Sequence, residues 1–240
     1  MEFFCNFAVL NSDSQKYASM NRMILRYLTF LTGLFFLSLG MVLIVTSTLG
    51  TTPISSVNYV LSVNTPMTLG IATFWVNMVL IIGQILLVGI RRETRREIIE
   101  ILLQIPLSLV FSVFIDMNMA WVSQLAPTGY AEALLLLGAG CLSQAFGVTL
   151  ELKPNVAIMS GEGFVKYAAR RWQWNFGHCK IGFDVTLVAL AALCSLLMAG
   201  RVEGIREGTV VAALCTGMLV NFISRHILTR RNLHLLTFRR

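Results

Sequence analysis

The chain has 240 residues, of which 56% are hydrophobic and 13% are charged, and its formal net charge is +7. Soluble domains carry about 25% charged residues, so the composition excludes an ordinary soluble domain and favours a polytopic membrane protein. The positive charge does not indicate nucleic-acid binding, because the basic residues form short groups between long apolar runs.

Residues 1–20 form an N-terminal extension that we expect to be poorly ordered. A short apolar start, MEFFCNFAVL, is followed by the polar NSDSQKYAS. This segment has neither the basic region nor the small-residue cleavage site of a signal peptide. The sequence leaves open whether Met1 or Met20 is the native start.

Six apolar runs follow the extension. A membrane-spanning helix needs about 20 such residues, and it must be helical because no water satisfies its backbone in the hydrocarbon core. The third run contains Pro106. The predicted spans are 24–49, 68–90, 98–121, 131–150, 179–200 and 209–228.

The distribution of Lys and Arg predicts the orientation, because cytoplasmic loops carry the excess of basic residues. Basic residues precede the first span, separate the second from the third and the fourth from the fifth, and follow the sixth. The loops 50–67 and 122–130 have none; Arg201 and Arg206, after the fifth span, are a weak exception. We therefore expect a multi-pass membrane protein with both termini and the basic tail (231–240) in the cytoplasm.

Two segments interrupt the apolar runs and begin short amphipathic helices: 51–57, TTPISSV, and 155–165, NVAIMSGEGFV. Thr52 at the N-cap and Pro53 at the first helical position favour a helix start. Glu162 lies in the first turn of the second helix, where the helix dipole favours a carboxylate. These helices either lie in the headgroup region, with Lys and Arg facing anionic lipid, or are re-entrant, with their N-termini binding a substrate.

The chain also matches itself when it is shifted by 107 positions without a gap. The coinciding pairs are Gly33 with Gly140, Gly40 with Gly147, Gly70 with Gly177, Asn77 with Asp184, and Glu100 with Glu207. Each unit holds three spans, so the second unit enters the membrane from the opposite side, as in many secondary transporters. The predicted fold is all-α: six transmembrane helices in two inverted three-helix repeats (21–122 and 123–230), with two short re-entrant or interfacial helices.

Four segments resemble the bacterial YczE/YyaS/YitT family of integral membrane proteins: LGMVLIVTSTLGTTPISSVNYVLS, LLQIPLSLVFSVFID, MSGEGFVKYAAR and GIREGTVVAAL. The likeness runs over about residues 28–222. Ser160 stands where many relatives have Pro before Gly-Glu-Gly. The resemblance implies a multi-pass protein of the bacterial inner (plasma) membrane and no particular activity.

The candidate binding residues lie in or near the two breaks. They are Thr52, Ser55, Ser56, Asn58, Ser160, Gly161, Glu162, Gly163 and Lys166. We expect Lys166, four residues after Glu162, to pair with it. Asp184 and its mate Asn77 lie within spans, where polar groups are costly and often functional; they serve either ion coupling or helix packing. Gln104 is expected to bond the carbonyl that Pro106 leaves free.

The sequence predicts no catalytic, metal or cofactor site. It lacks HExxH, GxSxG and Walker motifs, and its five cysteines are scattered, without the spacing of a disulfide framework or zinc site. We therefore expect no enzyme. The leading interpretation is a secondary transporter or exporter of a small polar or anionic solute by alternating access. The alternative is a non-transporting membrane scaffold or sensor subunit.

The predicted partners are the lipid bilayer and an unidentified small-molecule solute, with no nucleic acid. A homo-oligomer or a membrane partner protein stays open. The two functional interpretations predict different structures. Transport predicts a polar cavity lined by both breaks, whereas a scaffold predicts breaks lying flat on opposite surfaces around a dry bundle.

Overall fold

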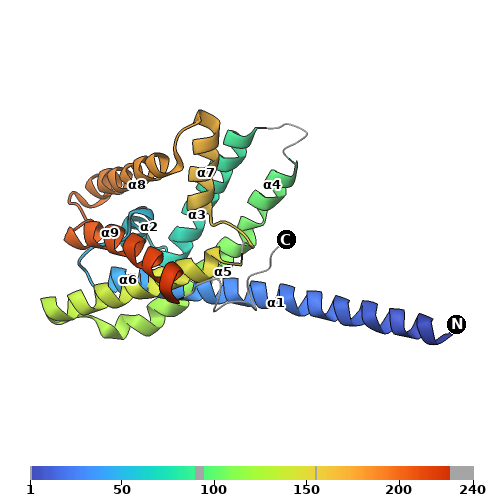
Figure 1. Ribbon diagram of the computed structural model, residues 1–240. Helices are drawn as coiled ribbons and strands as arrows, with labels where there is room; N and C mark the ends of the chain where they lie inside the picture. Colours follow the sequence, from blue (N-terminus) through green and yellow to red (C-terminus); the bar gives the residue numbers. More distant parts are fainter. Residues whose placement is uncertain (1, 90–94, 155, 228–240) are drawn as a thin grey trace.

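The computed structural model describes residues 2–89, 95–154 and 156–227, and this part of the chain is all-helical (Figure 1). Met1, Arg91, Arg92 and the predicted tail 231–240 lie outside the described residues. The elements are α1 (Glu2–Thr46), α2 (Pro53–Asn64), α3 (Leu69–Val88), α4 (Arg95–Leu102), α5 (Gln104–Val122), η2 (Ser123–Leu125), α6 (Tyr130–Leu152), α7 (Ser160–Trp172), α8 (Phe176–Ala199), α9 (Glu207–Phe222) and η3 (Ile223–Ile227).

Several helices are long and apolar enough to cross a membrane, which confirms the prediction of an all-α, multi-span protein. These candidate spans are Met23–Thr46, Leu69–Val88, Glu97–Leu125, Tyr130–Leu152 and Phe176–Ala199. The predicted sixth span, 209–228, corresponds to α9, which has 16 residues, and to the π-helical η3 that continues it. Residue 228 lies outside the described part, as does residue 90 at the end of the predicted second span.

The third span is broken where proline chemistry requires it. α4 ends at Leu102 and α5 begins at Gln104, two residues before Pro106. Pro106 has no backbone N–H to donate, and its ring crowds the carbonyl of Leu102 four residues earlier. The span therefore consists of two helices joined at Leu103.

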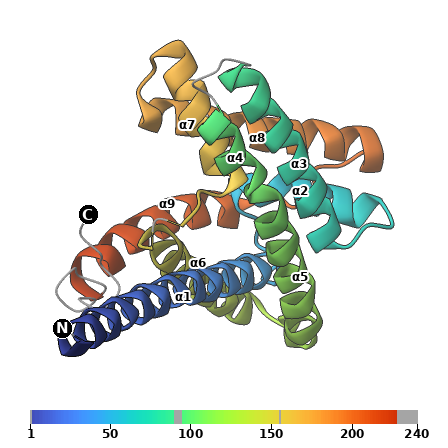
Figure 2. The ribbon, with the colours of Figure 1, turned by 90° about the vertical axis from the view of Figure 1, so that its right-hand side faces the viewer.

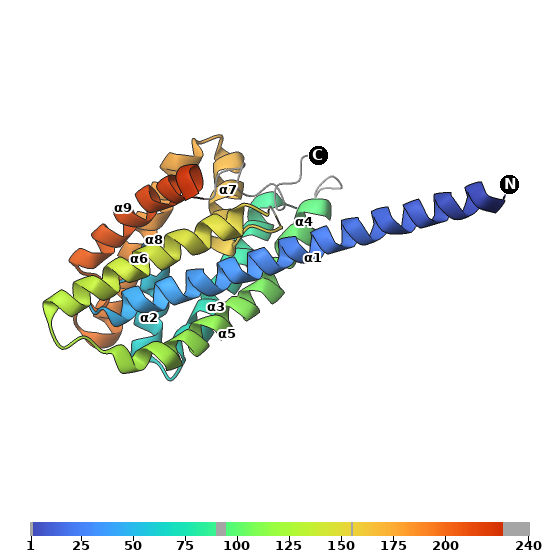
Figure 3. The same ribbon diagram turned by 60° about the horizontal axis from the view of Figure 1, so that its bottom comes forward.

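The first span is part of one long helix. α1 begins at Glu2 and projects well beyond the bundle at its N-terminal end (Figures 1 and 3). The predicted extension 1–20 is thus helical from Glu2. The predicted division of the chain at residues 20, 122 and 230 stays a prediction.

α1 and α6 run antiparallel and form the most extensively packed pair of helices in the described part of the chain (Figures 2 and 3). A methyl group on Gly40 would collide with the backbone of Gln144, and one on Gly147 with the backbone of Leu37. Gly33 lies equally close to Glu151, as Gly140 does to Ile44. Glycines allow this approach because helix association in membranes depends on close van der Waals packing.

These contacts recur at the offset of the sequence repeat. Adding 107 to the numbers Gly33 and Ile44 gives Gly140 and Glu151, so one contact is the exchanged copy of the other. Gly40 with Gln144 and Gly147 with Leu37 are related in the same way.

Each short helix also packs against a helix of the other half of the chain. Val57 and Val60 of α2 pack on Leu187 and Ala191 of α8. In the same manner α7 packs on α3. The two halves differ in one respect. In the first half α3 packs along α5, but in the second half α8 does not pack along α9 over the described lengths of those helices.

Candidate functional site

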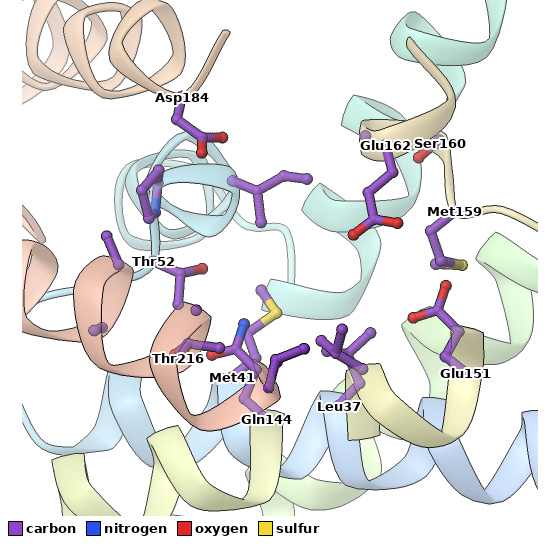
Figure 4. Close-up of a pocket in the computed structure, with 18 of the residues that line it drawn as sticks. Leu37, Met41, Thr52, Gln144, Glu151, Met159, Ser160, Glu162, Asp184 and Thr216 are labelled. Carbon is purple, nitrogen blue, oxygen red and sulfur yellow. The ribbon is translucent and has the colours of Figure 1, made fainter. Parts of the chain in front are cut away.

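Both helix breaks open into one cavity of about 400 Å³ between the halves of the chain (Figure 4). α2 and α7 supply their N-termini, and α1, α3, α5, α6, α8 and α9 supply the walls. The polar lining residues are Thr52, Asn58, Thr73, Asn77, Gln144, Glu151, Ser160, Glu162, Lys180, Asp184 and Thr216. Leu37, Met41, Phe111, Val148 and Met159 are among the apolar ones. The cavity is therefore mixed in character, with polar groups set into an apolar wall.

The N-terminus of α2 is held by its own side chains. Thr52 is the N-cap and Pro53 the first helical residue, as the sequence predicts. The Ser55 hydroxyl lies 2.6 Å from the Thr52 hydroxyl and accepts from the Thr52 backbone N–H at 3.1 Å. Ser56 donates to the Pro53 carbonyl. Thr52 and Asn58 thus line the cavity, whereas Ser55 and Ser56 are fully buried within the helix start.

The N-terminus of α7 is tied to α3 and touches α2. Ser160 donates its hydroxyl proton to Oδ1 of Asn77 at 2.7 Å. A methyl group on Gly161 would strike the side chain of Ile54 in α2, so the two breaks meet there. The predicted residues Asn77, Ser160 and Gly161 are therefore brought together at the cavity.

Gln104 and Gln84 form a buried pair of side-chain amides outside the cavity lining, and Gly163 packs against this pair. Gln84 of α3 and Gln104 of α5 exchange two hydrogen bonds of 3.0 Å, and Gln84 also donates to the Ser160 carbonyl at 3.0 Å. Gly163 leaves room for these amides. Gln104 is thus committed to Gln84 rather than to the carbonyl that Pro106 leaves free, which corrects the prediction. Gln84 was missed, although an amide in the middle of an apolar span is itself a signal.

Replacing Gln104 with Leu is expected to lower the free energy of unfolding by about 2 kcal/mol, because Oε1 of Gln84 stays buried without a partner. The double variant Gln84→Leu/Gln104→Leu should lose less than the sum of its single variants, since it removes both partners. Unfolding in a fixed detergent measures these values, and the exposed Gln124→Leu is the control. Additive losses would contradict the pairing.

The acidic residues Glu162 and Asp184 both face the cavity, and the cation beside them is Lys180. Nζ of Lys180 lies 2.6 Å from Oδ1 of Asp184. No ion pair joins Glu162 to Lys166 in the described part of the chain; Lys166 is exposed, 5.5 Å from the ring centre of Tyr167. The expected Glu162–Lys166 pair is therefore not formed. Burial raises the pKa of Glu162, against the lowering effect of Lys180.

This raised pKa predicts a pH dependence of stability. A carboxyl group with a higher pKa in the folded state binds its proton more tightly there, so its contribution favours the folded state at low pH. The free energy of unfolding should fall as the pH rises above 4.5, the ordinary value, through the raised pKa. In Glu162→Gln this part of the pH dependence should disappear. Thermal unfolding against pH tests it, with the exposed Glu207→Gln as control; an unchanged profile in Glu162→Gln would refute it.

Glu151, in the last turn of α6, is a cavity residue that the candidate set did not include. Its side chain is 3% exposed, and its Oε1 has no hydrogen-bond partner. Figure 4 shows its carboxylate and that of Glu162 pointing toward one another across the cavity. From the sequence, a carboxylate at the end of a predicted span is expected to lie at the membrane surface, and only the packing of α6 against α1 encloses this one.

Four further side chains reach the cavity with an unpartnered polar atom: Oδ1 of Asn58, Nδ2 of Asn77, Oε1 of Gln144 and Oγ1 of Thr216. Asn58, Asn77 and Gln144 are each at most 9% exposed. Asn58 donates through Nδ2 to the Thr73 hydroxyl at 3.1 Å, which leaves its oxygen free. A buried polar atom without a partner costs about 1–3 kcal/mol. The lining is thus suited to a solute that forms hydrogen bonds.

Asp116, a carboxylate of the predicted third span, does not line the cavity. Its carboxylate accepts from the Thr68 hydroxyl at 2.7 Å and from the Gly70 backbone N–H at 2.8 Å. Both donors belong to the start of α3. Asp116 therefore joins α5 to the N-terminus of α3, where the helix dipole favours a negative charge.

Comparison with known protein families identifies a family for this chain. The model of a family of unknown function, DUF6198, matches residues 24–225. No curated protein and no solved structure matches the chain. The matched region runs from the membrane-spanning part of α1 into η3, so it contains every residue that lines the cavity.

Proposed function

We propose that this chain, which belongs to the DUF6198 family of unknown function, is a secondary transporter of a small polar solute. The observation that carries the proposal is the cavity: it joins both helix breaks, and four buried polar side chains present unpartnered atoms there. Transporter sites lie at the interface of two repeats, beside interrupted helices. A non-transporting scaffold has no use for such a cavity, and no enzymatic activity is proposed.

Two finer features belong to the same proposal. We take the chain to be an inverted repeat, which the exchanged contacts between α1 and α6 support. We also take it to be related to the YczE/YyaS/YitT family, which the quoted sequence segments support. The bacterial inner membrane is what that resemblance implies, and the distribution of basic residues favours cytoplasmic termini.

The unequal packing of the halves supports alternating access. In the first half Asp116 of α5 holds the N-terminus of α3. The equivalent positions of the second half are Asn175, before α8, and Ile223, after α9; these two helices do not pack along one another over their described lengths. With the proposed orientation, the cavity is closed on the outer side and accessible from the cytoplasm.

Cysteine cross-linking tests this asymmetry in a variant without the five native cysteines. The pair Thr68→Cys with Asp116→Cys should oxidise rapidly, because the parent side chains are in contact and the packing of α3 along α5 keeps the two positions close after their hydrogen bond is removed. The equivalent pair Asn175→Cys with Ile223→Cys should oxidise slowly and become faster when a transported solute is added. Equal rates for both pairs without solute would contradict an inward-accessible state.

Transport itself is tested by a thermal-shift screen of metabolites with the purified protein, because a ligand that binds the folded state raises its apparent stability. We expect a hit to be weakened by Asn58→Leu and to be carried by proteoliposomes along an imposed gradient. Binding without flux would contradict a transporter and favour a sensor. Flux that persists unchanged in Asn58→Leu would separate transport from this cavity.

A further inference from the structure

The charge of the cavity is negative, and this bears on the solute. Three carboxylates, Glu151, Glu162 and Asp184, line it beside one ammonium group, that of Lys180. Nζ of Lys180 forms an ion pair with Oδ1 of Asp184, at 2.6 Å. Lys153, two residues beyond Glu151, does not line the cavity. Glu151 and Glu162, which repel one another electrostatically, therefore face the same space with no cation paired to either in the described part of the chain.

The unpartnered atoms around these carboxylates are mostly acceptors. Oε1 of Glu151, Oδ1 of Asn58 and Oε1 of Gln144 accept hydrogen bonds, Nδ2 of Asn77 donates, and the hydroxyl of Thr216 can do either. An ionised carboxylate that is buried without a partner is strongly disfavoured. Such a group either keeps a proton or binds a cation. The helix N-termini by themselves would favour an anion, but two facing carboxylates outweigh them.

Building on the transport function proposed above, we infer that the cavity binds an organic cation with N–H donors, such as an ammonium or guanidinium group, between Glu151 and Glu162. The hydrogen-bond acceptors take its N–H groups, and Leu37, Met41 and Met159 contact its apolar part. The same carboxylates hold a proton when the cation is absent. Binding of the cation then releases a proton to water, so the two ions exchange at one site.

The cation-binding inference is tested with three probes that share one ring and differ in charge: benzylammonium, benzyl alcohol and benzoate. The full-length protein in detergent is titrated at pH 7, and its melting temperature is recorded. Benzylammonium should raise the melting temperature as its concentration increases, because it binds the folded state. Benzyl alcohol controls for partition into the detergent and should give no such rise. Neither should benzoate.

Substitutions then test whether the probe binds between Glu151 and Glu162. Glu151→Gln and Glu162→Gln keep the side-chain shape and remove the charge; each should weaken benzylammonium binding about 30-fold, as loss of a buried charged partner does. Glu132→Gln, at the exposed opposite end of α6, should bind as the wild type does. Calorimetry in buffers of different ionisation enthalpy should detect proton release in the wild type and less in either variant. If Glu151→Gln does not fold, Glu162→Gln carries the test.

The outcomes also separate this inference from the transport proposal. A benzoate shift that is lost in Asn58→Leu would keep a solute-binding cavity but overturn the cation. Two other outcomes would overturn the cation-binding inference: benzylammonium binding that is equal in the wild type and both carboxylate variants, and no binding of any probe. Transport would still be decided by the metabolite screen and the flux assay.

Discussion

Replacing Gly147 with Ala is expected to destabilise the protein by about 1–3 kcal/mol, the usual cost of overpacking. The added methyl group would meet the backbone N and Cα of Leu37 and the carbonyl oxygen of Gly33. These atoms belong to the backbone of α1, so no side-chain rotation relieves the collision, and α1 and α6 must move apart. Because both helices line the cavity between the halves, the cavity should be disturbed as well.

A matched variant on the same helix controls for the change of residue type. Gly138 of α6 has nothing within 4 Å of its added Cβ. Gly138→Ala should therefore leave stability unchanged or raise it by up to about 1 kcal/mol, the difference in helix propensity between the two residues. Thermal unfolding in one detergent compares both variants with the wild type. If Gly147→Ala were as stable as Gly138→Ala, the close approach of α1 and α6 would be refuted.

Removing the carboxylate of Asp116 is expected to cost about 3 kcal/mol of unfolding free energy, since hydrogen bonds to charged groups contribute about 1.5–3 kcal/mol each and such losses are not additive. Asp116→Ala leaves the Thr68 hydroxyl and the Gly70 N–H without their acceptor and removes a negative charge from the N-terminus of α3. It should also open the outer side of the cavity, because this carboxylate joins α5 to α3.

Two comparisons make the Asp116 experiment specific. Asp116→Asn keeps one acceptor oxygen, so its stability should fall between that of Asp116→Ala and the wild type. Glu207→Gln removes an exposed carboxylate that lies 3.7 Å from Arg206, and exposed ion pairs contribute at most about 1 kcal/mol. Solute flux in proteoliposomes gives a second readout. Equal stability of Asp116→Ala and Glu207→Gln would exclude the proposed role in closing the outer side.

The sequence predicted the positions of the helices well, but it predicted only some of the breaks between them. Thr52 and Pro53 predicted the start of α2 because N-cap and first-turn preferences act within a few residues. The break at Leu103 follows from Pro106 but was not placed in advance, because a proline in a span is tolerated as a kink or a break according to the neighbouring helices.

Only some of the candidate binding residues line the cavity, for a similar reason. Thr52, Asn58, Ser160 and Glu162 line the cavity with Asn77 and Asp184. Ser55 and Ser56 are used within their own helix, and Lys166 faces outward. Helical periodicity tells which residues share a face, but it does not tell which neighbour that face meets. Glu151 and Gln84 acquire their roles only through such neighbours.

By itself the sequence determined that the chain is a multi-span membrane protein with two broken, polar segments, because chain length, hydropathy and local helix signals are properties of short stretches. Only the tertiary structure decided that both segments meet at one cavity, that Glu151 faces Glu162 there, and that α3 packs along α5 while α8 stands clear of α9 over their described lengths. The physical reason is that packing depends on contacts between residues far apart in the chain. Glycines at Gly40 and Gly147 permit the approach of α1 and α6, but which charges are then enclosed without partners follows from the whole arrangement.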